Sequence, residues 1–331
     1  MKELLTVRNL CIGFRSGKKV FPVVDGVSFG VSRGEILALV GESGCGKSIS
    51  CMALTGLLPM PPATVRAESI LFAGQELARA DEKTLRKVRG GGIAYIFQEP
   101  SASLNPVFRV GEQIAEVLEL HRPEVHSQRD EVLKLLRQVG IPDPESRMEA
   151  YPHELSGGMQ QRIMIAMALA GNPALLVADE PTTALDVTIQ AQILDLIRDS
   201  CRARRMGVIL VTHNLGIVAE TADTVAVMYA GRMAEIASAG ELLGHPAHPY
   251  TRALLKAVPY IGMKEKKLST IRGNVPPPDQ YPAGCRFFGR CELCDRLPEA
   301  VRKHCASQVP SMKEIAHGHF CACHAMEEEA V

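Results

Sequence analysis

The sequence predicts an α/β fold in which a largely parallel sheet is covered by helices. Short apolar, β-branched runs alternate with helical patterns, and this alternation is typical of parallel strands joined by helices. A glycine-rich octapeptide, Gly41-Glu42-Ser43-Gly44-Cys45-Gly46-Lys47-Ser48, stands between the first run and a proline-free segment that can be helical. A phosphate-binding loop requires that position between strand and helix. The apolar runs are residues 36–40, 93–97, 174–178, 208–212 and 225–229.

Three segments depart from that alternation. The first 35 residues contain short strand patterns without an intervening helix, which predicts an antiparallel β-layer at the N-terminus. Around residues 112–147 the chain is charged, with apolar residues at spacings of three and four, which predicts an inserted helical subdomain over about 105–170. Val275-Pro276-Pro277-Pro278 marks an extended connector in a small Cys-rich C-terminal extension. We therefore predict a main domain over 1–244 and the extension over 245–331.

Charge and hydropathy argue against two kinds of partner. Lys plus Arg and Asp plus Glu number 37 each, so no net field favours nucleic acid or an anionic membrane surface. No apolar run approaches the roughly 18 to 20 residues that cross a bilayer. The N-terminus lacks the long apolar core of a signal peptide. We expect a cytoplasmic protein that binds no nucleic acid.

The octapeptide has the chemistry of a site for a nucleoside triphosphate. Its glycines let backbone N–H groups converge on phosphate oxygens, where a side chain would block the approach. Lys47 can neutralise the β and γ charge, and the Ser48 hydroxyl can bind Mg²⁺. The following helix adds its own dipole at its N-terminus. The predicted nucleotide-binding residues of this segment are Gly41, Ser43, Gly44, Cys45, Gly46, Lys47, Ser48 and Ile49.

A second motif places two carboxylates at the end of an apolar strand. Residues 174–178 lead directly into Asp179 and Glu180. In folds with a phosphate-binding loop, the carboxyl ends of the strands face the phosphates. Asp179 is therefore placed to hold Mg²⁺, directly or through water, and Glu180 to polarise an attacking water. Capping of a following helix is the alternative reading of such acids, and Pro181 weakens it.

A third motif, Ser156-Gly157-Gly158-Met159-Gln160, precedes a long helix that ends near residues 171–173. Ser156 at an N-cap, followed by two glycines that bare the backbone amides, makes a second helix terminus that can bind an anion. Taken alone the motif is weak, because Ser-Gly-Gly opens many ordinary helices. Its position about twenty residues before Asp179 strengthens the functional interpretation.

With these three motifs in this order, the chain resembles the nucleotide-binding subunits of ABC transporters. Residues 156–160 are similar to the family signature, with Met159 where many members carry Gln. The resemblance implies ATP and Mg²⁺ as ligands, and it assigns further roles by position. These are Gln98 as the Q-loop residue that also approaches Mg²⁺, Ala184-Leu185-Asp186 as the D-loop, His213 as the switch histidine beside an unusual Asn214, and Phe14 as the ring that stacks on adenine. Alone, Gln98 reads as a surface amide, His213 as a strand-end histidine and Phe14 as a core residue.

The resemblance also implies a head-to-tail dimer. In the family fold, the signature helix belongs to the outlying helical subdomain and cannot reach the nucleotide held by its own phosphate-binding loop. Two ATP molecules are then held between the loop of one subunit and the signature serine of the other. Closure and reopening would drive alternating access in membrane subunits that contact the region near Gln98.

Further segments are similar to the ATP-binding subunits of dipeptide, oligopeptide and nickel importers. They are residues 97–100, 103–106, 151–155, 184–192 and 248–251. Within that group, residues 41–50 and 162–170 resemble the first of two paired ATPases. The resemblance implies two integral-membrane permease subunits, a paralogous ATPase as the partner in a heterodimer, and an extracytoplasmic substrate-binding protein. It places the chain on the cytoplasmic face of the membrane. Peptide import is the expected function, and nickel or another small solute is the alternative.

Six of the ten cysteines lie between residues 285 and 323, and such crowding in a reducing compartment indicates metal ligation. Cys285, Cys291, Cys305 and Cys323 match the family positions that are associated with a four-iron cluster. The match is imperfect, since the spacing from Cys291 to Cys305 is long and Cys294 and Cys321 are extra. Zn²⁺ bound by Cys291, Cys294, Cys321 and Cys323 is the alternative.

The competing function from another class is a soluble ABC ATPase of DNA repair or translation. Such proteins usually add coiled coils, a second ATPase cassette or a basic surface, and the sequence carries none of these patterns. A third reading makes the Cys-rich extension a redox or metal sensor that regulates the ATPase. It is compatible with transport. The predicted catalytic residues are Glu180, His213 and Gln98.

Overall fold

A computed structural model describes residues 3–183, 185–257 and 270–327 of the chain. The chain forms two compact units that are interleaved along the sequence. The first unit comprises Met1–Leu4, Val31–Ile36 and Arg79–Leu210. The second comprises Leu5–Gly30, Leu37–Ala78 and Val211–Val331. In the described residues, none of the helices combines the length and the apolar character that a membrane span needs.

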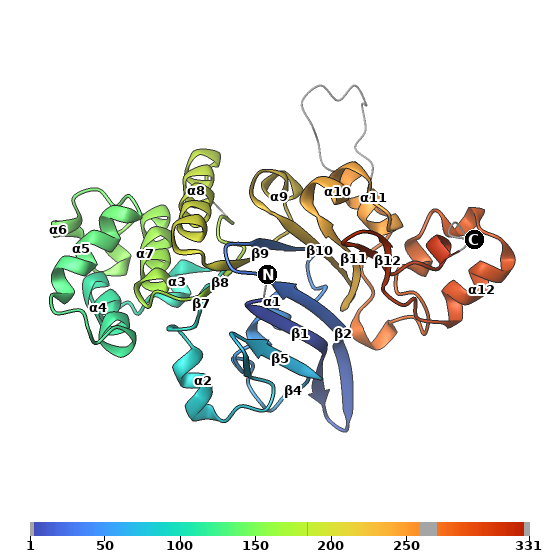
Figure 1. Cartoon of the computed structure of the whole chain (residues 1–331), viewed down its shortest axis with the longest axis horizontal. Helices are drawn as coiled ribbons and strands as arrows, with labels where there is room; N and C mark the ends of the chain where they lie inside the picture. Colours follow the sequence, from blue (N-terminus) through green and yellow to red (C-terminus); the bar gives the residue numbers. More distant parts are fainter. Residues whose placement is uncertain (1–2, 184, 258–269, 328–331) are drawn as a thin grey trace. The chain divides into compact units, whose positions relative to one another are not determined.

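The second unit contains the predicted antiparallel layer, drawn in blue in Figure 1. Its strand order is β2-β1-β5-β6, and β4 also pairs with β1. Val7 of β1 lies opposite Ile70 of β5, and both side chains are buried. Apolar residues alternate with exposed ones along β1 because one face of this sheet packs inward. The strands are β1 (Leu5–Ser16), β2 (Lys19–Val31), β4 (Ala63–Arg66), β5 (Ser69–Phe72) and β6 (Gln75–Glu76).

A larger sheet contributes the order β12-β13-β11-β10-β3 to the second unit. β3 (Ile36–Val40) is buried at all five positions and runs parallel to β10 (Thr224–Tyr229). The hairpin of β12 (Lys313–Ala316) and β13 (His319–Cys321) lies beyond β11 (Arg232–Ser238), at a place where the sequence pattern predicted no strand. The helices are α1 (Lys47–Ala53), α9 (Leu215–Thr221), α10 (Ala239–Gly244), α11 (Pro249–Lys256), α12 (Glu299–Ser307) and the 3-10 turns Pro278–Gln280, Phe288–Arg290, Cys294–Arg296 and His324–Glu327.

The first unit holds the neighbouring strands β7 (Ile93–Ile96), β8 (Leu175–Asp179) and most of β9 (Gly207–Thr212). β7 and β8 are parallel, with Ala94 opposite Leu176. The predicted apolar runs in both units agree with the observed strands to within one residue at either end. The helices are α2 (Glu82–Val88), α3 (Pro100–Ser103), α4 (Val110–His121), α5 (Gln128–Gln138), α6 (Pro144–Arg147), α7 (Gly157–Ala170), α8 (Val187–Arg204) and the 3-10 turn Pro152–Glu154.

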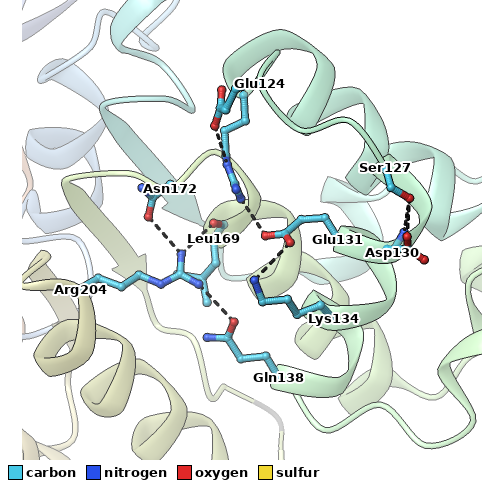
Figure 2. Close-up of polar contacts among 10 residues, drawn as sticks. Glu124, Ser127, Asp130, Glu131, Lys134, Gln138, Leu169, Asn172 and Arg204 are labelled. Carbon is cyan, nitrogen blue, oxygen red and sulfur yellow. Dashed lines mark hydrogen bonds and ion pairs between the residues drawn. The ribbon is translucent and has the colours of Figure 1, made fainter.

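Helices α4, α5 and α7 pack on one another through the apolar residues that the spacing of three and four predicted. The end of α8 is fixed to this group by Arg204, whose guanidinium donates to the Leu169 carbonyl at 3.1 Å and to Gln138 Oε1 at 3.1 Å (Figure 2). Leu169 lies in the last turn of α7, where backbone carbonyls lack partners inside the helix. Arg204 therefore completes the α7 terminus and joins it to α5.

In the second unit, three aromatic rings connect the strand core to the C-terminal segment, which is defined here as residues 270–327. Tyr229 of β10 lies 4.6 Å from Tyr250 of α11 and 5.1 Å from Phe287, measured between ring centroids. All three residues are buried. Edge-on and tilted ring contacts of this kind stabilise the fold by more than the burial of their apolar area alone. The C-terminal segment is thus packed into the core of the unit.

His248 makes the stability of the second unit depend on pH. It caps α11 by accepting the Tyr250 N–H at Nδ1, 3.0 Å away, and burial lowers its pKa to about 4. The unfolded chain binds the proton near pH 6.5, so this contribution is present above that pH and is lost as pH falls toward 4. The parent should lose about 3 kcal/mol more than His248→Asn between pH 7 and pH 4.

Urea unfolding of both proteins across this range measures the difference. Asn keeps an acceptor at the N-cap but does not titrate. His317→Asn, at an exposed histidine of the same unit, is the matched control and should keep the pH dependence of the parent. Equal slopes for parent and His248→Asn would contradict the assignment.

Candidate functional site

The glycine-rich octapeptide forms a tight loop between β3 and α1. Gly41 has φ +152°, and a Cβ built there would lie 2.2 Å from the Met228 carbonyl oxygen of β10. Gly46 is the N-cap of α1 with φ +102°, and its Cβ would meet Val24 at 2.9 Å. The approach of the Met228 backbone leaves room only for glycine at position 41, and the positive φ at both positions also favours glycine. The loop can therefore form because glycines stand where it passes close to β10 and β2.

Lys47 is buried at the centre of this loop. Its ammonium donates to the carbonyl of Gly41 at 2.8 Å and to that of Glu42 at 3.1 Å, and it lies 3.7 Å from the Cys45 sulfur. Burial raises the pKa of the Cys45 thiol even though Lys47 opposes that shift. A cation held against the carbonyls of the loop is positioned for an anion that binds to the loop amides. Ser48 and Ile49 follow in the first turn of α1 and are half-buried.

Neighbouring elements of the second unit support the loop from outside. The Gly231 N–H donates to the Cys45 carbonyl at 2.9 Å, and the Glu42 N–H donates to Tyr250 Oη at 2.8 Å. The Glu42 carboxylate accepts two hydrogen bonds from Arg290, at 2.7 and 3.0 Å. Sequence reasoning did not assign Tyr250 or Arg290 to the site. Tyr250 lies in the family-like segment 248–251 and Arg290 stands beside Cys291, but no local pattern connects either residue to Glu42.

The predicted carboxylates lie at the end of β8 in the first unit. Asp179 is the last residue of the strand, and Glu180 follows it with φ +47°, a left-handed conformation that is uncommon for a residue with a side chain. Glu180 Oε2 accepts from Gln98 Nε2 at 3.3 Å and from Thr183 Oγ1 at 2.9 Å. The structure therefore brings together Gln98 and Glu180, two of the predicted catalytic residues. A strained backbone that its neighbours hold in place is a common property of functional sites.

The signature segment begins α7 in the same unit. Ser156 is the N-cap and accepts the Met159 N–H at 3.4 Å. Outside its chain neighbours and the backbone of its own helix, no atom of the described residues lies within 4 Å of the Cβ position of Gly157, and Ser156 and Gly157 are exposed. Gln160 is turned back to the carbonyls of Pro152 and Leu155, at 2.8 and 3.2 Å. The N-terminal turn of α7 thus presents backbone amides and a hydroxyl at the surface of its unit.

The remaining predicted residues are distributed over both units. In the first unit, Asp186 is the N-cap of α8 and accepts the Ile189 N–H at 2.9 Å, while Ala184 lies outside the described residues. In the second unit, His213 follows β9 and is exposed, and Phe14 is half-buried in β1 opposite Ala63. Asn214 is the N-cap of α9, and its Oδ1 accepts the Gly216 N–H at 2.9 Å.

Five of the six cysteines of the C-terminal segment line one cavity. Its lining includes all four predicted cluster ligands, Cys285, Cys291, Cys305 and Cys323, together with Cys294 and His324. Burial raises the pKa of Cys285 to about 12 and that of Cys291 to about 11, and neighbouring thiols add to both shifts. Cys321, one of the four zinc candidates, lies in β13 opposite Glu235.

The side chains at this cavity are not arranged as a metal site. Across residues 3–183, 185–257 and 270–327, no group of three or more His, Cys, Asp or Glu side chains could hold a metal ion as placed. Four thiols around one small cavity are nevertheless the donor chemistry that iron–sulfur clusters use. The four thiols are thus suitable ligands for the predicted iron–sulfur cluster. Their positions in the structure, however, do not form a metal site.

A buried strand, a glycine loop around a lysine, a helix and a second strand that ends in two acids define a P-loop nucleoside triphosphatase. Comparisons with known proteins make that class more specific. Residues 24–183 match the family model described as ABC transporter, and residues 234–296 match the one described as oligopeptide/dipeptide transporter, C-terminal region.

Two curated relatives match along almost the whole chain. The oligopeptide transport ATP-binding protein AppD of Bacillus subtilis is 46% identical over 99% of this chain and 98% of its own length. The dipeptide transport ATP-binding protein DppD of Escherichia coli is 45% identical over 97% and 96%, respectively. The chain therefore belongs to the ABC transporter family, among the oligopeptide and dipeptide transport ATP-binding proteins, and it is an ATPase.

Solved structures agree with the fold. The ATP-binding cassette MJ0796, solved as a dimer with ADP and phosphate, covers 71% of this chain and 98% of its own length with a TM-score of 0.64 and 24% identity. The cbiO1 protein of Clostridium perfringens covers 74% and 92%, with a TM-score of 0.61 and 26% identity. These structures show the α/β cassette with its antiparallel sheet and helices.

Proposed function

We propose that this chain is the ATP-hydrolysing subunit that energises the import of di- or oligopeptides through membrane permease subunits. The observation that carries the proposal is similarity along the whole length to peptide-transport ATP-binding proteins, which includes both the cassette and the C-terminal region. The buried Lys47 within an intact glycine loop supports nucleotide binding. The names of both relatives favour peptides over nickel as the cargo.

In this proposal the phosphate-binding loop, from Gly41 to Ile49, binds the ATP phosphates and Lys47 neutralises their charge. Ser48, Gln98 and Asp179 hold Mg²⁺, and Phe14 stacks on the adenine. Glu180 polarises the attacking water, and its contact with Gln98 at 3.3 Å supports joint action of these two residues. His213 acts as the switch histidine. A positioned carboxylate of this kind acts as a general base, and Mg²⁺ held by these residues would stabilise charge on the phosphates.

The signature residues 156–160 and Asp186 act on a second subunit. The exposed Ser156 and the open space at Gly157 leave the N-terminus of α7 accessible to another molecule's nucleotide. We infer a heterodimer with a paralogous ATPase, two permease subunits, and an extracytoplasmic binding protein that delivers the peptide. This assembly places the chain at the cytoplasmic face of the membrane.

The domain division that we propose has a nucleotide-binding domain over 1–244, with a helical subdomain at about 105–170, and a Cys-rich extension over 245–331. Two separate family models, over residues 24–183 and 234–296, support a division into two regions, although the second model begins at residue 234, within the proposed first domain. The packing of α4, α5 and α7 on one another supports the helical subdomain.

The [4Fe-4S] cluster at Cys285, Cys291, Cys305 and Cys323 stays a prediction, with Zn²⁺ as its alternative. Its support is the shared cavity of the four thiols. Metal binding would require these cysteines to be thiolates, whereas burial raises their pKa.

Glu180→Gln should retain ATP binding and slow hydrolysis by about 10²-fold or more, because it removes a general base but little ground-state contact. Phosphate release by the full-length chain, assembled with its transporter partners, measures hydrolysis, and titration with a fluorescent ATP analogue measures binding. Glu119→Gln, at an exposed acid of α4, is the matched control. Turnover at the parental rate in Glu180→Gln would refute this assignment.

Lys47→Ala should weaken ATP binding about tenfold or more, because it removes charge-assisted hydrogen bonds to the phosphates. Equilibrium titration of the full chain with MgATP tests this expectation. Lys18→Ala removes an exposed lysine of the same unit and should leave the affinity unchanged. Equal affinity of Lys47→Ala and the parent would overturn the phosphate-binding role of the loop.

Full-length protein purified without oxygen should be brown and contain iron and acid-labile sulfide in equal amounts if the cluster is present. Cys285→Ser should lose most of this iron, whereas Cys11→Ser, outside the cavity, should retain it. Colourless protein with stoichiometric zinc would show that the alternative metal occupies the site.

A further inference from the structure

The C-terminal segment reaches the phosphate-binding loop through Arg290. This residue ends the 3-10 turn Phe288–Arg290, and only 8% of its side chain is exposed. Its Nη1 donates to Glu42 Oε2 at 2.7 Å and to Tyr229 Oη at 3.2 Å, and its Nη2 donates to Glu42 Oε1 at 3.0 Å. Its Nε and Nη2 also donate to the carbonyls of Arg272 and Gly273, at 2.6 and 3.0 Å. These five hydrogen bonds equal the five N–H donors of a guanidinium.

Glu42 is the second residue of the loop, and its backbone takes part in placing Lys47. The Glu42 carbonyl accepts from Lys47 Nζ at 3.1 Å and from the Cys45 N–H at 3.3 Å. Its own N–H donates to Tyr250. A displacement of the Glu42 side chain would therefore move a carbonyl that holds the central ammonium. The chain of contacts runs from Arg290 through Glu42 to Lys47.

The burial of this ion pair distinguishes it from ordinary surface pairs. Side-chain exposure is 8% for Arg290 and 28% for Glu42, whereas the pair Arg86–Glu82 has exposures of 78% and 57%. Exposed pairs contribute little to stability, but breaking a buried, bidentate pair leaves an uncompensated charge in the protein interior, which is far more costly. The geometry also requires arginine, because lysine cannot donate to both carboxylate oxygens in one plane and to two carbonyls as well.

A second arginine, Arg286, also lies between Cys285 and Cys291 and contacts another part of the support of the loop. Arg286 donates to the Ala230 carbonyl and, at 2.8 Å, to Asp25 Oδ2. Gly231, which follows Ala230 in the chain, donates its N–H to the Cys45 carbonyl of the loop. The turn between Cys285 and Cys291 thus contacts the support of the loop at two points.

We propose that Arg290 is a positioning residue of the nucleotide site. By holding the Glu42 carboxylate, it fixes the loop backbone that places Lys47, so that the C-terminal segment sets the affinity for nucleotide. The inference rests on the proposed role of Lys47 at the phosphates. It makes the C-terminal segment part of the ATPase machinery.

The test is a double-mutant cycle on the KM for ATP in the full-length chain assembled with its partners. Arg290→Met should raise this KM about tenfold, the scale of a lost charge-assisted pair, with a smaller effect on kcat. Glu42→Gln should raise it similarly. Because both act through one contact, Arg290→Met/Glu42→Gln should show a KM close to that of either single variant. Arg302→Met, at an exposed arginine of α12, should behave like the parent.

Additive effects in the double variant, or an unchanged KM in folded Arg290→Met, would overturn the proposal. If Arg290→Met does not fold, Arg290→Lys replaces it in the same cycle, since lysine keeps the charge but not the paired hydrogen bonds. A role in stability alone would lower the unfolding midpoint of Arg290→Lys and leave its KM at the parental value, which also counts against positioning. Failure of the parent itself to bind MgATP would instead refute the proposed function.

Discussion

Close approach of backbone segments around the phosphate-binding loop is the constraint on which the second unit depends. Gly41 crosses β10 at a distance that excludes a methyl group, and a Cβ at Gly231 would lie 1.9 Å from the Val23 carbonyl. The Gly231 N–H in turn holds the Cys45 carbonyl. β2, β3, β10 and the loop are therefore joined through main-chain contacts, which substitutions of surface side chains do not alter. A loop fixed in this way can bind an anion with little reorganisation.

The strands and the loop could be predicted because their signals are local. Five consecutive apolar residues in Ile36–Val40 correspond to five buried positions, and the glycine spacing that follows is required by the loop itself. The hairpin of β12 and β13 was not predicted, because Lys313–Ala316 is exposed throughout and has no apolar run. Its strand conformation comes from pairing with β13, and β13 pairs with Glu235 and Ile236 of β11. A strand that forms because of tertiary pairing in this way cannot be predicted from the strand propensity of its residues.

The residues of the candidate site likewise fall into those that local sequence patterns predicted and those that such patterns could not predict. Asp179 and Glu180 could be predicted from the strand that precedes them, whereas the roles of Gln98 and His213 came from family resemblance. Gln98 and Glu180 are 82 positions apart, and no local pattern connects them. Arg290 and Glu42 are separated by 248 positions. Composition and periodicity report only on neighbours in the sequence. A contact between residues that lie 82 or 248 positions apart can therefore be identified only from the folded structure.

The two arginines of the cysteine-flanked turn are not equivalent, and the difference indicates which one positions the loop. Arg286 shares Asp25 Oδ2 with Arg232, and burial lowers its pKa to about 10. Among the described residues, its buried Nε has no hydrogen-bond partner. Arg290 instead has both oxygens of Glu42, and hydrogen bonds to that carboxylate raise its pKa against the effect of burial. A cation whose donors are all satisfied holds its partner in one geometry, while an under-satisfied one leaves alternatives of similar energy. The more rigid restraint on the phosphate-binding loop is therefore the contact of Arg290 with Glu42.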